Sequence, residues 1–249
     1  MRFIPLRLRI RNHPNVNMNI ITKETEELVK NVWKNVDAVC FDVDSTVITE
    51  EGIDCLAEFC KKGNEVAEWT KRAMGGGIPY EIALAERLKI IKPARQQIET
   101  FLQCKPATLT QGIQELIEYL NKKKIHVYLV SGGFKSLIAP IALKLNIPSE
   151  RIYANRLKFY YDGEFAGYDT EQPTSRSGGK AIVADNLKKQ GYKNIVFIGD
   201  GVTDLETTNH AHAFIGFGGN VVREAVKNQS GWFVTDFNVL KRFHEKENA

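Results

Sequence analysis

Short runs of apolar residues, each followed by polar or glycine residues, recur along the chain and predict buried strands. The clearest runs are Asp37–Asp44, Ile125–Val130 and Asn194–Ile198, and weaker ones are Ala213–Phe217 and Trp232–Phe237. A run of four to eight apolar residues is typical of a strand that is covered on both faces. The polar residues at the ends of these runs are therefore the first candidates for chemistry.

Segments with apolar residues at helical spacing lie between these runs. Gly112–Lys124 has apolar residues at positions 113, 116, 117 and 120, and Ser136–Leu145 and Lys180–Lys189 have similar patterns. Strands that alternate with helices predict an α/β fold with a Rossmann-like, mostly parallel sheet and helices on both faces. In such sheets, ligands bind at the carboxyl ends of the strands.

Two segments interrupt this alternation. Residues 53–105 contain helical patterns but no good strand, and they exceed an ordinary crossover, so we predict an inserted helical-bundle cap. Aromatic residues on both sides of Asp162-Gly163 predict a β-hairpin. The expected organisation is a poorly ordered N-terminal extension over residues 1–30, a core formed by residues 31–52 and 106–249, and a cap over residues 53–105.

Charge is distributed unevenly. Residues 1–23 contain five basic residues and no acidic one, so the rest of the chain contains 29 basic and 30 acidic residues. A near-neutral folded part lacks the basic face that nucleic acids require, so we expect no nucleic-acid partner. No stretch of about 18 uncharged apolar residues predicts a membrane span. The four cysteines form no Cys-x-x-Cys pair, which favours a reducing compartment and a cytoplasmic protein, with organellar targeting by residues 1–23 as the alternative.

Four aspartates follow predicted strands. Asp42 and Asp44 are two residues apart, so on a regular strand they would share one face. Asp200 and Asp204 follow another strand in the sequence Gly-Asp-Gly-Val-Thr-Asp. Buried carboxylates are costly unless a cation compensates them, and oxygen ligands suit Mg²⁺. The alternative is that the aspartates cap the following helices.

Two further segments suggest phosphate binding. Ser131-Gly132-Gly133 separates a strand from a helix, a position that favours anions, although an ordinary turn is the alternative. Lys180 is expected in the first turn of a helix, where a cation is unfavourable unless an anion compensates it; a solvated lysine is the alternative. Together these residues suggest phosphoryl transfer, in which one carboxylate attacks phosphorus and a second protonates the leaving oxygen.

One basic residue lies on an apolar face of the predicted cap. Arg87 shares a helical face with Leu84 and Ile91, so it needs a partner. It is either a bidentate partner for a carboxylate or an arginine that reaches solvent along the helix surface. Glu50 and Glu51 are candidates for binding an ammonium group, and the glycines after Met74 are candidates for a loop over a ligand.

These residues carry a family resemblance. Asp42-Val-Asp-Ser-Thr46, Ser131, Lys180 and Gly199–Asp204 resemble, in order, the four motifs of the haloacid-dehalogenase-like phosphohydrolases. More specifically, the chain is similar to the eukaryotic phosphoserine phosphatase family over about residues 30–243. The segments that carry this second similarity are Glu50–Ile53, Arg72–Gly76, Ser131–Phe134, Ala154–Leu157 and Phe214–Asn220.

The resemblance implies a set of roles. Asp42 would be the nucleophile that forms a phospho-aspartate, and Asp44 the general acid and base. Mg²⁺ would be held by Asp42, Asp200 and the backbone carbonyl of Asp44, with Asp204 in support. Phosphate would be bound by Ser131, Gly132 and Lys180, and the serine moiety would be surrounded by Glu51, Met74, Gly75, Arg87, Gly133 and Thr203. Members of this family are commonly homodimers.

Two other functions fit part of the pattern. Receiver domains also place acidic residues and a lysine at strand ends and carry a phospho-aspartate, but they have no cap and are about half this size. A phosphohydrolase for another small metabolite would share the core chemistry. Arg87 and Glu51 argue against that second alternative, because a substrate that carries both a carboxylate and an ammonium group calls for both charges.

Overall fold

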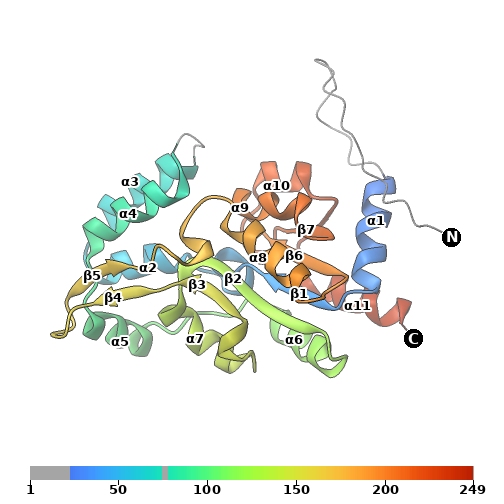
Figure 1. Ribbon diagram of the computed structural model, residues 1–249, viewed down its shortest axis with the longest axis horizontal. Helices are drawn as coiled ribbons and strands as arrows, with labels where there is room; N and C mark the ends of the chain where they lie inside the picture. Colours follow the sequence, from blue (N-terminus) through green and yellow to red (C-terminus); the bar gives the residue numbers. More distant parts are fainter. Residues whose placement is uncertain (1–22, 75–77, 249) are drawn as a thin grey trace, which may run out of the picture.

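A six-stranded parallel sheet forms the centre of the computed structural model, which describes residues 23–74 and 78–248 (Figure 1). Every pair of neighbouring strands is parallel, so all the carboxyl ends meet at one edge. This arrangement confirms the predicted α/β fold class. Across the sheet the strands are β3 (Ile152–Asn155), β2 (His126–Phe134), β1 (Ala38–Phe41), β6 (Ile195–Gly199), β7 (Ala213–Phe217) and β8 (Trp232–Val234).

The sheet is buried on both faces because its strand residues alternate between two apolar clusters. Val39 and Phe41 of β1 belong to one cluster, and Ala38 and Cys40 belong to the other. The first face is covered by α1 (Lys23–Lys34), α6 (Ile113–Lys122), α7 (Lys135–Lys144) and α11 (Phe237–Glu247). The second face is covered by α8 (Gly179–Lys189) and α10 (Glu224–Gln229).

A separate apolar cluster lies beside the sheet. Four helices of the predicted insertion form most of it: α2 (Gly52–Phe59), α3 (Gly63–Met74), α4 (Tyr80–Ile91) and α5 (Arg95–Cys104). The antiparallel strands β4 (Leu157–Phe159) and β5 (Phe165–Tyr168) pack against these helices and confirm the predicted hairpin. Gly163 in its turn has a φ of 90°, a left-handed conformation that favours glycine. Figure 1 shows these elements at the end of the molecule opposite α1 and α11.

The N-terminal part of the fold differs from the sequence-based expectation. Residues 23–30, expected to be poorly ordered, form the first turns of α1. They are ordered because Val29 and Trp33 of this helix are buried in the first cluster, which gives it an apolar side to pack. Residues 1–22, for which the expectation was also made, lie outside the described residues.

One whole strand and the end of another also differ from the prediction. β3, a four-residue edge strand, was not predicted, because its sequence Ile-Tyr-Ala-Asn is too short to show a pattern. β2 continues to Phe134, so the Ser131-Gly132-Gly133 segment belongs to the strand end and α7 begins at Lys135. The remaining short elements are α9 (Val202–Leu205), a π turn at Val43–Val47 and 3₁₀ turns at Ser149–Arg151, Pro173–Ser175 and Glu206–Asn209.

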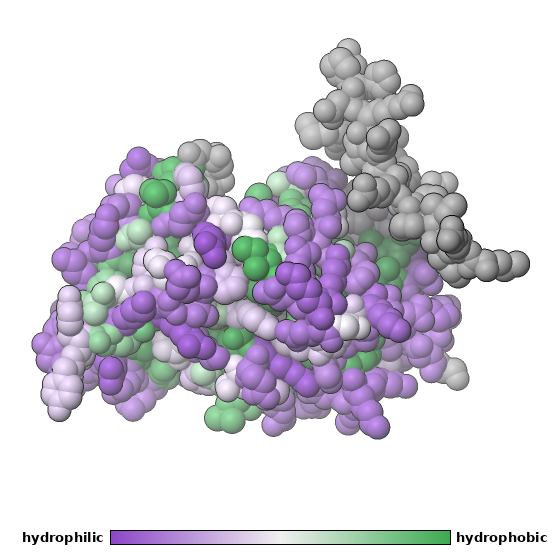
Figure 2. Space-filling view, in the orientation of Figure 1, coloured by the Kyte–Doolittle hydropathy of each residue, from purple (hydrophilic) through white to green (hydrophobic). Residues whose placement is uncertain are grey.

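The surface agrees with this division into buried and exposed residues. Figure 2 shows a mainly hydrophilic face on which apolar residues form small, separate groups. Within the described part of the chain, no helix has both the length and the apolar character needed to cross a bilayer.

Candidate active site

Asp42 lies in the turn that follows β1. The strand ends at Phe41, and the Asp42 side chain accepts a hydrogen bond from Val43 N at 2.7 Å. The chain then turns sharply, with Ser45 at a φ of 53°. We expected Asp42 and Asp44 to share a face of a regular strand, but both lie beyond the strand end. The turn directs Asp44 toward the insertion instead, where its Oδ1 accepts a hydrogen bond from Gly52 N at 2.7 Å.

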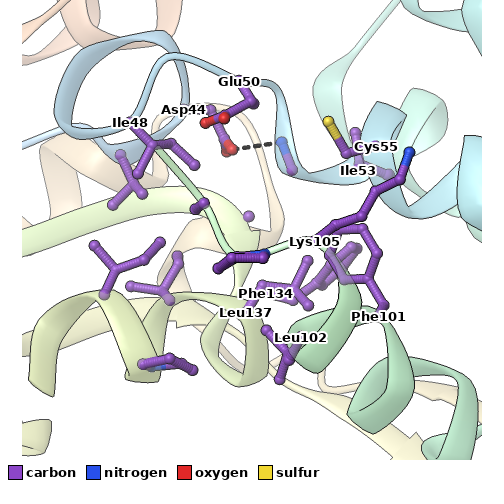
Figure 3. A pocket seen from close by; sticks show the side chains of 18 of the residues that line it. Asp44, Ile48, Glu50, Ile53, Cys55, Phe101, Leu102, Lys105, Phe134 and Leu137 are labelled. Carbon is purple, nitrogen blue, oxygen red and sulfur yellow. Dashed lines mark hydrogen bonds between the residues drawn. The ribbon is translucent and has the colours of Figure 1, made fainter. Parts of the chain in front are cut away.

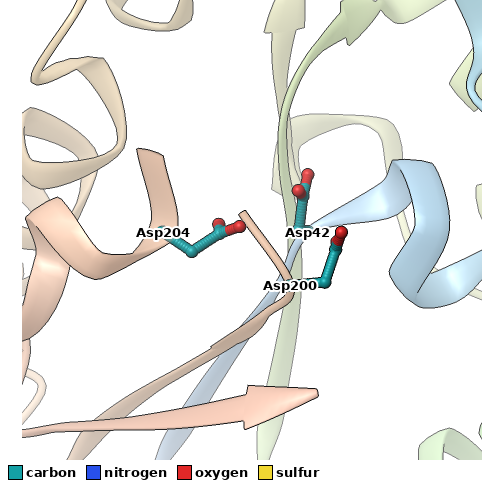
Figure 4. A group of neighbouring side chains, drawn as sticks. All are labelled: Asp42, Asp200 and Asp204. Carbon is teal, nitrogen blue, oxygen red and sulfur yellow. The ribbon is translucent and has the colours of Figure 1, made fainter. Parts of the chain in front are cut away.

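Three buried carboxylates meet at the carboxyl edge of the sheet. Asp42 follows β1, Asp200 follows β6 and Asp204 lies in α9 (Figure 4). One carboxylate oxygen from each lies within 4.8 Å of the others. Gly199 permits this approach, since a Cβ atom there would lie 2.3 Å from the Asp204 carboxyl carbon. Parallel strands thus bring together residues that are more than 150 positions apart in the sequence.

Two cations pair with this carboxylate group. Lys180 Nζ, in the first turn of α8, lies 2.9 Å from Asp42 Oδ1 and 2.8 Å from Asp204 Oδ1. Burial lowers the pKa of Lys180, but the carboxylates of Asp204 and Asp42 outweigh it and raise the pKa above its usual value. Arg223 Nε donates to Asp200 Oδ2 at 2.8 Å. The solvated-lysine alternative is therefore wrong, because Lys180 is 6% exposed and paired with two carboxylates.

The carboxylate group fits a hard divalent cation. Burial raises the pKa of Asp200 and of Asp204, and the nearby charge of Asp42 raises both further. A cation placed among the three carboxylates would relieve this repulsion, and an all-oxygen donor set suits Mg²⁺ or Ca²⁺. Thr46 Oγ1 donates to Asp200 Oδ1 at 2.8 Å, and Arg223 Nε donates to the other carboxylate oxygen of Asp200, Oδ2.

Asp44 lies in a different environment from Asp42. Burial, followed by the charges of Glu51 and Asp42, raises the pKa of Asp44 to about 7. Ser131 Oγ donates to Asp44 Oδ2 at 3.4 Å and accepts from Gly133 N at 2.8 Å. The surroundings of Asp44 therefore favour its protonated form more than those of an aspartate in water do.

An apolar cavity of about 240 Å³ borders Asp44 on the side of the insertion (Figure 3). Figure 3 shows the hydrogen bond from the Gly52 backbone to Asp44 above side chains such as Phe101, Phe134 and Leu137. These side chains come from α5, the end of β2 and α7. Asp44 is thus bordered mainly by apolar side chains, which agrees with burial as the main cause of its raised pKa.

Gly132 and Thr203 lie together beside a second, smaller pocket. They line a small pocket of about 20 Å³, whose other lining residues are Tyr80, Thr174, Arg176, Gly179, Lys180 and Glu206. The Tyr80 hydroxyl donates to the Gly132 carbonyl oxygen at 2.5 Å. The predicted phosphate-binding residues Gly132 and Lys180 are thus brought together, and a helix of the insertion lies against them.

The residues predicted to bind the serine moiety are only partly brought to this site. Arg87 is 9% exposed on α4, and its Nε donates to Ala83 O at 3.1 Å, while its terminal nitrogens have no hydrogen bond within the described residues. Glu51 accepts from Ser45 Oγ at 2.7 Å and pairs with Arg223 Nη2 at 3.1 Å. Met74 ends α3, and Gly75 lies outside the described residues.

Glu50 is not part of this group. Its two carboxylate oxygens accept hydrogen bonds from the backbone N–H of Thr108, at 3.1 and 3.2 Å. Glu50 therefore joins the two chain segments that connect the insertion to the core. Of the two neighbouring glutamates, only Glu51 is a candidate for the site.

Four residues at the site were not assigned a role from the sequence. Thr46 and Arg223 contact Asp200, and Tyr80 and Asn155 contact Gly132. Thr46 follows the acidic motif directly, so its position was an available indication. Arg223 and Tyr80 come from a loop and a helix outside every strand end, where a local pattern gives no indication.

The chain was compared with known proteins after this geometry was established. The family model described as haloacid dehalogenase-like hydrolase matches residues 36–212. A protein of Bos taurus named phosphoserine phosphatase is 52% identical over 210 residues, which cover 84% of this chain and 93% of that protein. This chain belongs to the phosphoserine phosphatase family of haloacid dehalogenase-like hydrolases.

Two other members of the family show how far the similarity extends. The chloroplastic phosphoserine phosphatase of Arabidopsis thaliana is 49% identical over 215 residues, which cover 85% of this chain and 73% of that protein. A solved structure of a phospho-aspartyl intermediate analogue of phosphoserine phosphatase has a TM-score of 0.72 at 27% identity. It covers 84% of this chain and 98% of that one, so the likeness includes both the sheet and the helical insertion.

Proposed function

We propose that this protein hydrolyses O-phospho-L-serine to L-serine and inorganic phosphate, in a Mg²⁺-dependent reaction with a phospho-aspartate at Asp42. The observation that carries the proposal is the group of three buried carboxylates paired with Lys180 at the carboxyl edge of the sheet. The names of the relatives and the intermediate analogue in the similar solved structure support it.

Asp42 is the proposed nucleophile. Its Oδ1 is occupied by Val43 N and Lys180, while its Oδ2 has no hydrogen bond within the described residues and is the oxygen available for attack. Attack forms a bond from Oδ2 to phosphorus and breaks the bond from phosphorus to the serine oxygen. Lys180, Ser131 and Gly132 are the proposed ligands of the phosphoryl oxygens.

Asp44 is the proposed general acid and base. Its raised pKa of about 7 means that a substantial fraction is protonated at neutral pH, so it can give a proton to the departing serine oxygen. It then takes a proton from the water that attacks phosphorus, which releases phosphate and restores the Asp42 carboxylate. Its Oδ1 stays bonded to Gly52 N, so Oδ2 is the oxygen that exchanges the proton.

The proposed metal site uses the Asp42 and Asp200 carboxylates with the Asp44 backbone carbonyl, and Asp204 supports it. A bound Mg²⁺ would offset the repulsion between the phosphate and these carboxylates. Arg223 and Thr46 hold Asp200 from its two sides, so its orientation is fixed before any ligand binds. Lys180 holds Asp42 and Asp204 in the same way.

The helices α2–α5 form the proposed cap domain over this site. They carry Arg87, whose buried guanidinium is the proposed partner of the substrate carboxylate, and Met74, which precedes the proposed substrate-binding residue Gly75 in the sequence. The core and its connection to the cap supply Glu51, Gly133 and Thr203. Glu51 is the proposed partner of the substrate ammonium, which would share this carboxylate with Arg223.

The test is the release of inorganic phosphate from O-phospho-L-serine, measured with Mg²⁺ and with an excess of chelator. We expect Mg²⁺-dependent release at least about tenfold faster than from sugar phosphates. Release from other esters but not from phosphoserine would contradict the proposed substrate and favour a phosphohydrolase for another metabolite. A single phosphorylation without turnover would instead indicate a receiver-like protein.

A further inference from the structure

We propose that Tyr80 is a positioning residue for the reaction. Its hydroxyl, carried by α4, orients the peptide group between Gly132 and Gly133 and, through this peptide, the Ser131 hydroxyl and Asp44. The inference rests on the proposed function, because it assigns Ser131 and Asp44 their roles there. It adds a residue from the helical insertion that acts without touching the reacting atoms.

The carbonyl end of this peptide is held by two donors. The Tyr80 hydroxyl donates to Gly132 O at 2.5 Å, and Asn155 Nδ2 donates to the same oxygen at 2.7 Å. Asn155 is itself fixed, since Thr174 Oγ1 donates to its Oδ1 at 3.1 Å. Asn155 Nδ2 also reaches the Tyr80 hydroxyl oxygen at 3.3 Å. The Gly132 carbonyl oxygen therefore accepts one hydrogen bond from the core, through Asn155, and one from the helical insertion, through Tyr80.

The N–H group of the same peptide is directed toward Ser131, which in turn bonds to Asp44. Gly133 N donates to Ser131 Oγ at 2.8 Å, and Ser131 Oγ donates to Asp44 Oδ2 at 3.4 Å. The peptide group is planar, so holding its carbonyl oxygen also sets the direction of its N–H. Two successive glycines have wide conformational freedom, which makes external hydrogen bonds the means of fixing this peptide.

Burial favours the donor form of Tyr80. It raises the pKa of the Tyr80 hydroxyl to about 12, so the proton that Gly132 O accepts is present throughout the neutral range. Contact with the backbone is close: a Cβ atom on Gly132 would lie 2.5 Å from the Tyr80 hydroxyl oxygen. The Tyr80 hydroxyl can therefore approach this closely because residue 132 is glycine.

A second set of hydrogen bonds holds the N-terminal end of α4 and does not involve Gly132. Ser177 Oγ donates to Glu81 Oε2 at 3.0 Å and accepts from Tyr80 N at 3.3 Å, and Ser177 N donates to Glu81 Oε2 at 3.1 Å. These bonds are exposed and hold the helix start to the loop before α8. Ser177→Ala gives a matched control, because it removes the two bonds of the Ser177 hydroxyl at the start of α4 and does not remove the Tyr80 hydroxyl.

The experiment compares Tyr80→Phe with Ser177→Ala in steady-state hydrolysis of phosphoserine and p-nitrophenyl phosphate. Tyr80→Phe removes one oxygen and keeps the ring, so the fold should survive, which a thermal melt checks. We expect its kcat on phosphoserine to fall about threefold to tenfold with KM within about twofold, the size expected for one lost hydrogen bond. Ser177→Ala should keep kcat within about twofold.

The second substrate tests the route through Asp44. Nitrophenolate departs without a proton, so Tyr80→Phe should lose less kcat/KM on p-nitrophenyl phosphate than on phosphoserine. The comparison uses kcat/KM because it covers the steps up to the phospho-aspartate, whereas the later attack of water is common to both substrates. An unchanged kcat, an equal loss on both substrates, or the same change in Ser177→Ala would overturn the inference. A wild-type protein that is inactive on phosphoserine would instead overturn the proposed function and, with it, this inference.

Discussion

Asp42 combines two roles that a single substitution can separate. It is the proposed nucleophile, and it also contributes a charge to a buried group that Lys180 and Arg223 only partly balance. Asp42→Asn keeps the shape of the side chain but removes the attacking oxyanion. We expect kcat on phosphoserine to fall by about a thousandfold or more. The melting temperature should stay within about 5 °C of wild type, because the substitution also removes one like charge from the group.

The control for Asp42→Asn is Asp185→Asn. The side chain of Asp185 is 45% exposed and bonds to the His210 ring at 2.8 Å, and Asp185 does not belong to the carboxylate group, so its substitution should leave both kcat and melting temperature unchanged. Phosphate release and a thermal melt measured on the two variants decide the matter. An Asp42→Asn protein that retains turnover would remove Asp42 as the nucleophile.

How far single residues could be predicted depended on where they lie. Asp42, Asp200 and Lys180 could be predicted because each lies next to a predicted strand or in the first turn of a predicted helix. Arg223 could not, because it lies between β7 and α10 in a segment without periodicity, and only the fold brings it to Asp200. The roles of the predicted residues stay predictions until the variants are measured.

Helix α1 shows how an element can be missed when a basic segment precedes it. Its Trp33 is fully buried and its Nε1 donates to Leu240 O of α11 at 3.0 Å, whereas Leu28 on the same helix is 64% exposed. Trp33→Ala should therefore lower the free energy of unfolding by about 3–5 kcal/mol, through the lost apolar contact, the cavity and the lost hydrogen bond. Urea unfolding measures this change.

Leu28→Ala is the matched control, and its effect should stay within about 0.5 kcal/mol. Both variants should keep the wild-type kcat at 25 °C if folded, because α1 lies at the end of the molecule opposite the helical insertion (Figure 1). Equal stabilities for the two variants would mean that α1 is not docked as the structure shows.

The elements that formed as predicted share a strong local pattern. β1, β6 and β7 are continuous apolar runs buried on both faces, and α6 has its apolar residues on one side. β3 is four residues long and owes its place at the sheet edge to pairing with β2, which no local pattern encodes. The end of β1 also differed from the prediction: Asp42 N still donates to Ile198 O of β6 at 2.9 Å, but Val43 N donates to the Asp42 side chain instead of to a neighbouring strand.

At the scale of the whole molecule, the site exists only where two parts of the chain meet. The turns and helices that follow the strands supply the carboxylates and Lys180, and the helical insertion supplies Tyr80 and the proposed substrate-binding residue Arg87. Alternation of strands and helices predicted the sheet, and the interruption predicted the insertion, but no local pattern indicated how one would face the other. The homodimer, the cytoplasmic location and the division at residues 53–105 stay predictions.

The proposed selectivity for serine is the property that most depends on how the helical insertion lies against the sheet. Arg87, the proposed partner of the substrate carboxylate, lies on α4. Its buried guanidinium is aligned by the bond from Nε to Ala83 O, and its terminal nitrogens, which have no hydrogen bond within the described residues, are the proposed donors to the carboxylate. Arg87→Ala should lower kcat/KM on phosphoserine by about tenfold to a hundredfold, the loss expected for a hydrogen-bonded charge. On p-nitrophenyl phosphate, which has no carboxylate, the loss should stay within about threefold. Lys89→Ala, on the same helix but exposed and paired with Glu86, controls for a general effect on the insertion. Equal losses on the two esters would show that Arg87 supports the helical insertion and does not select the substrate.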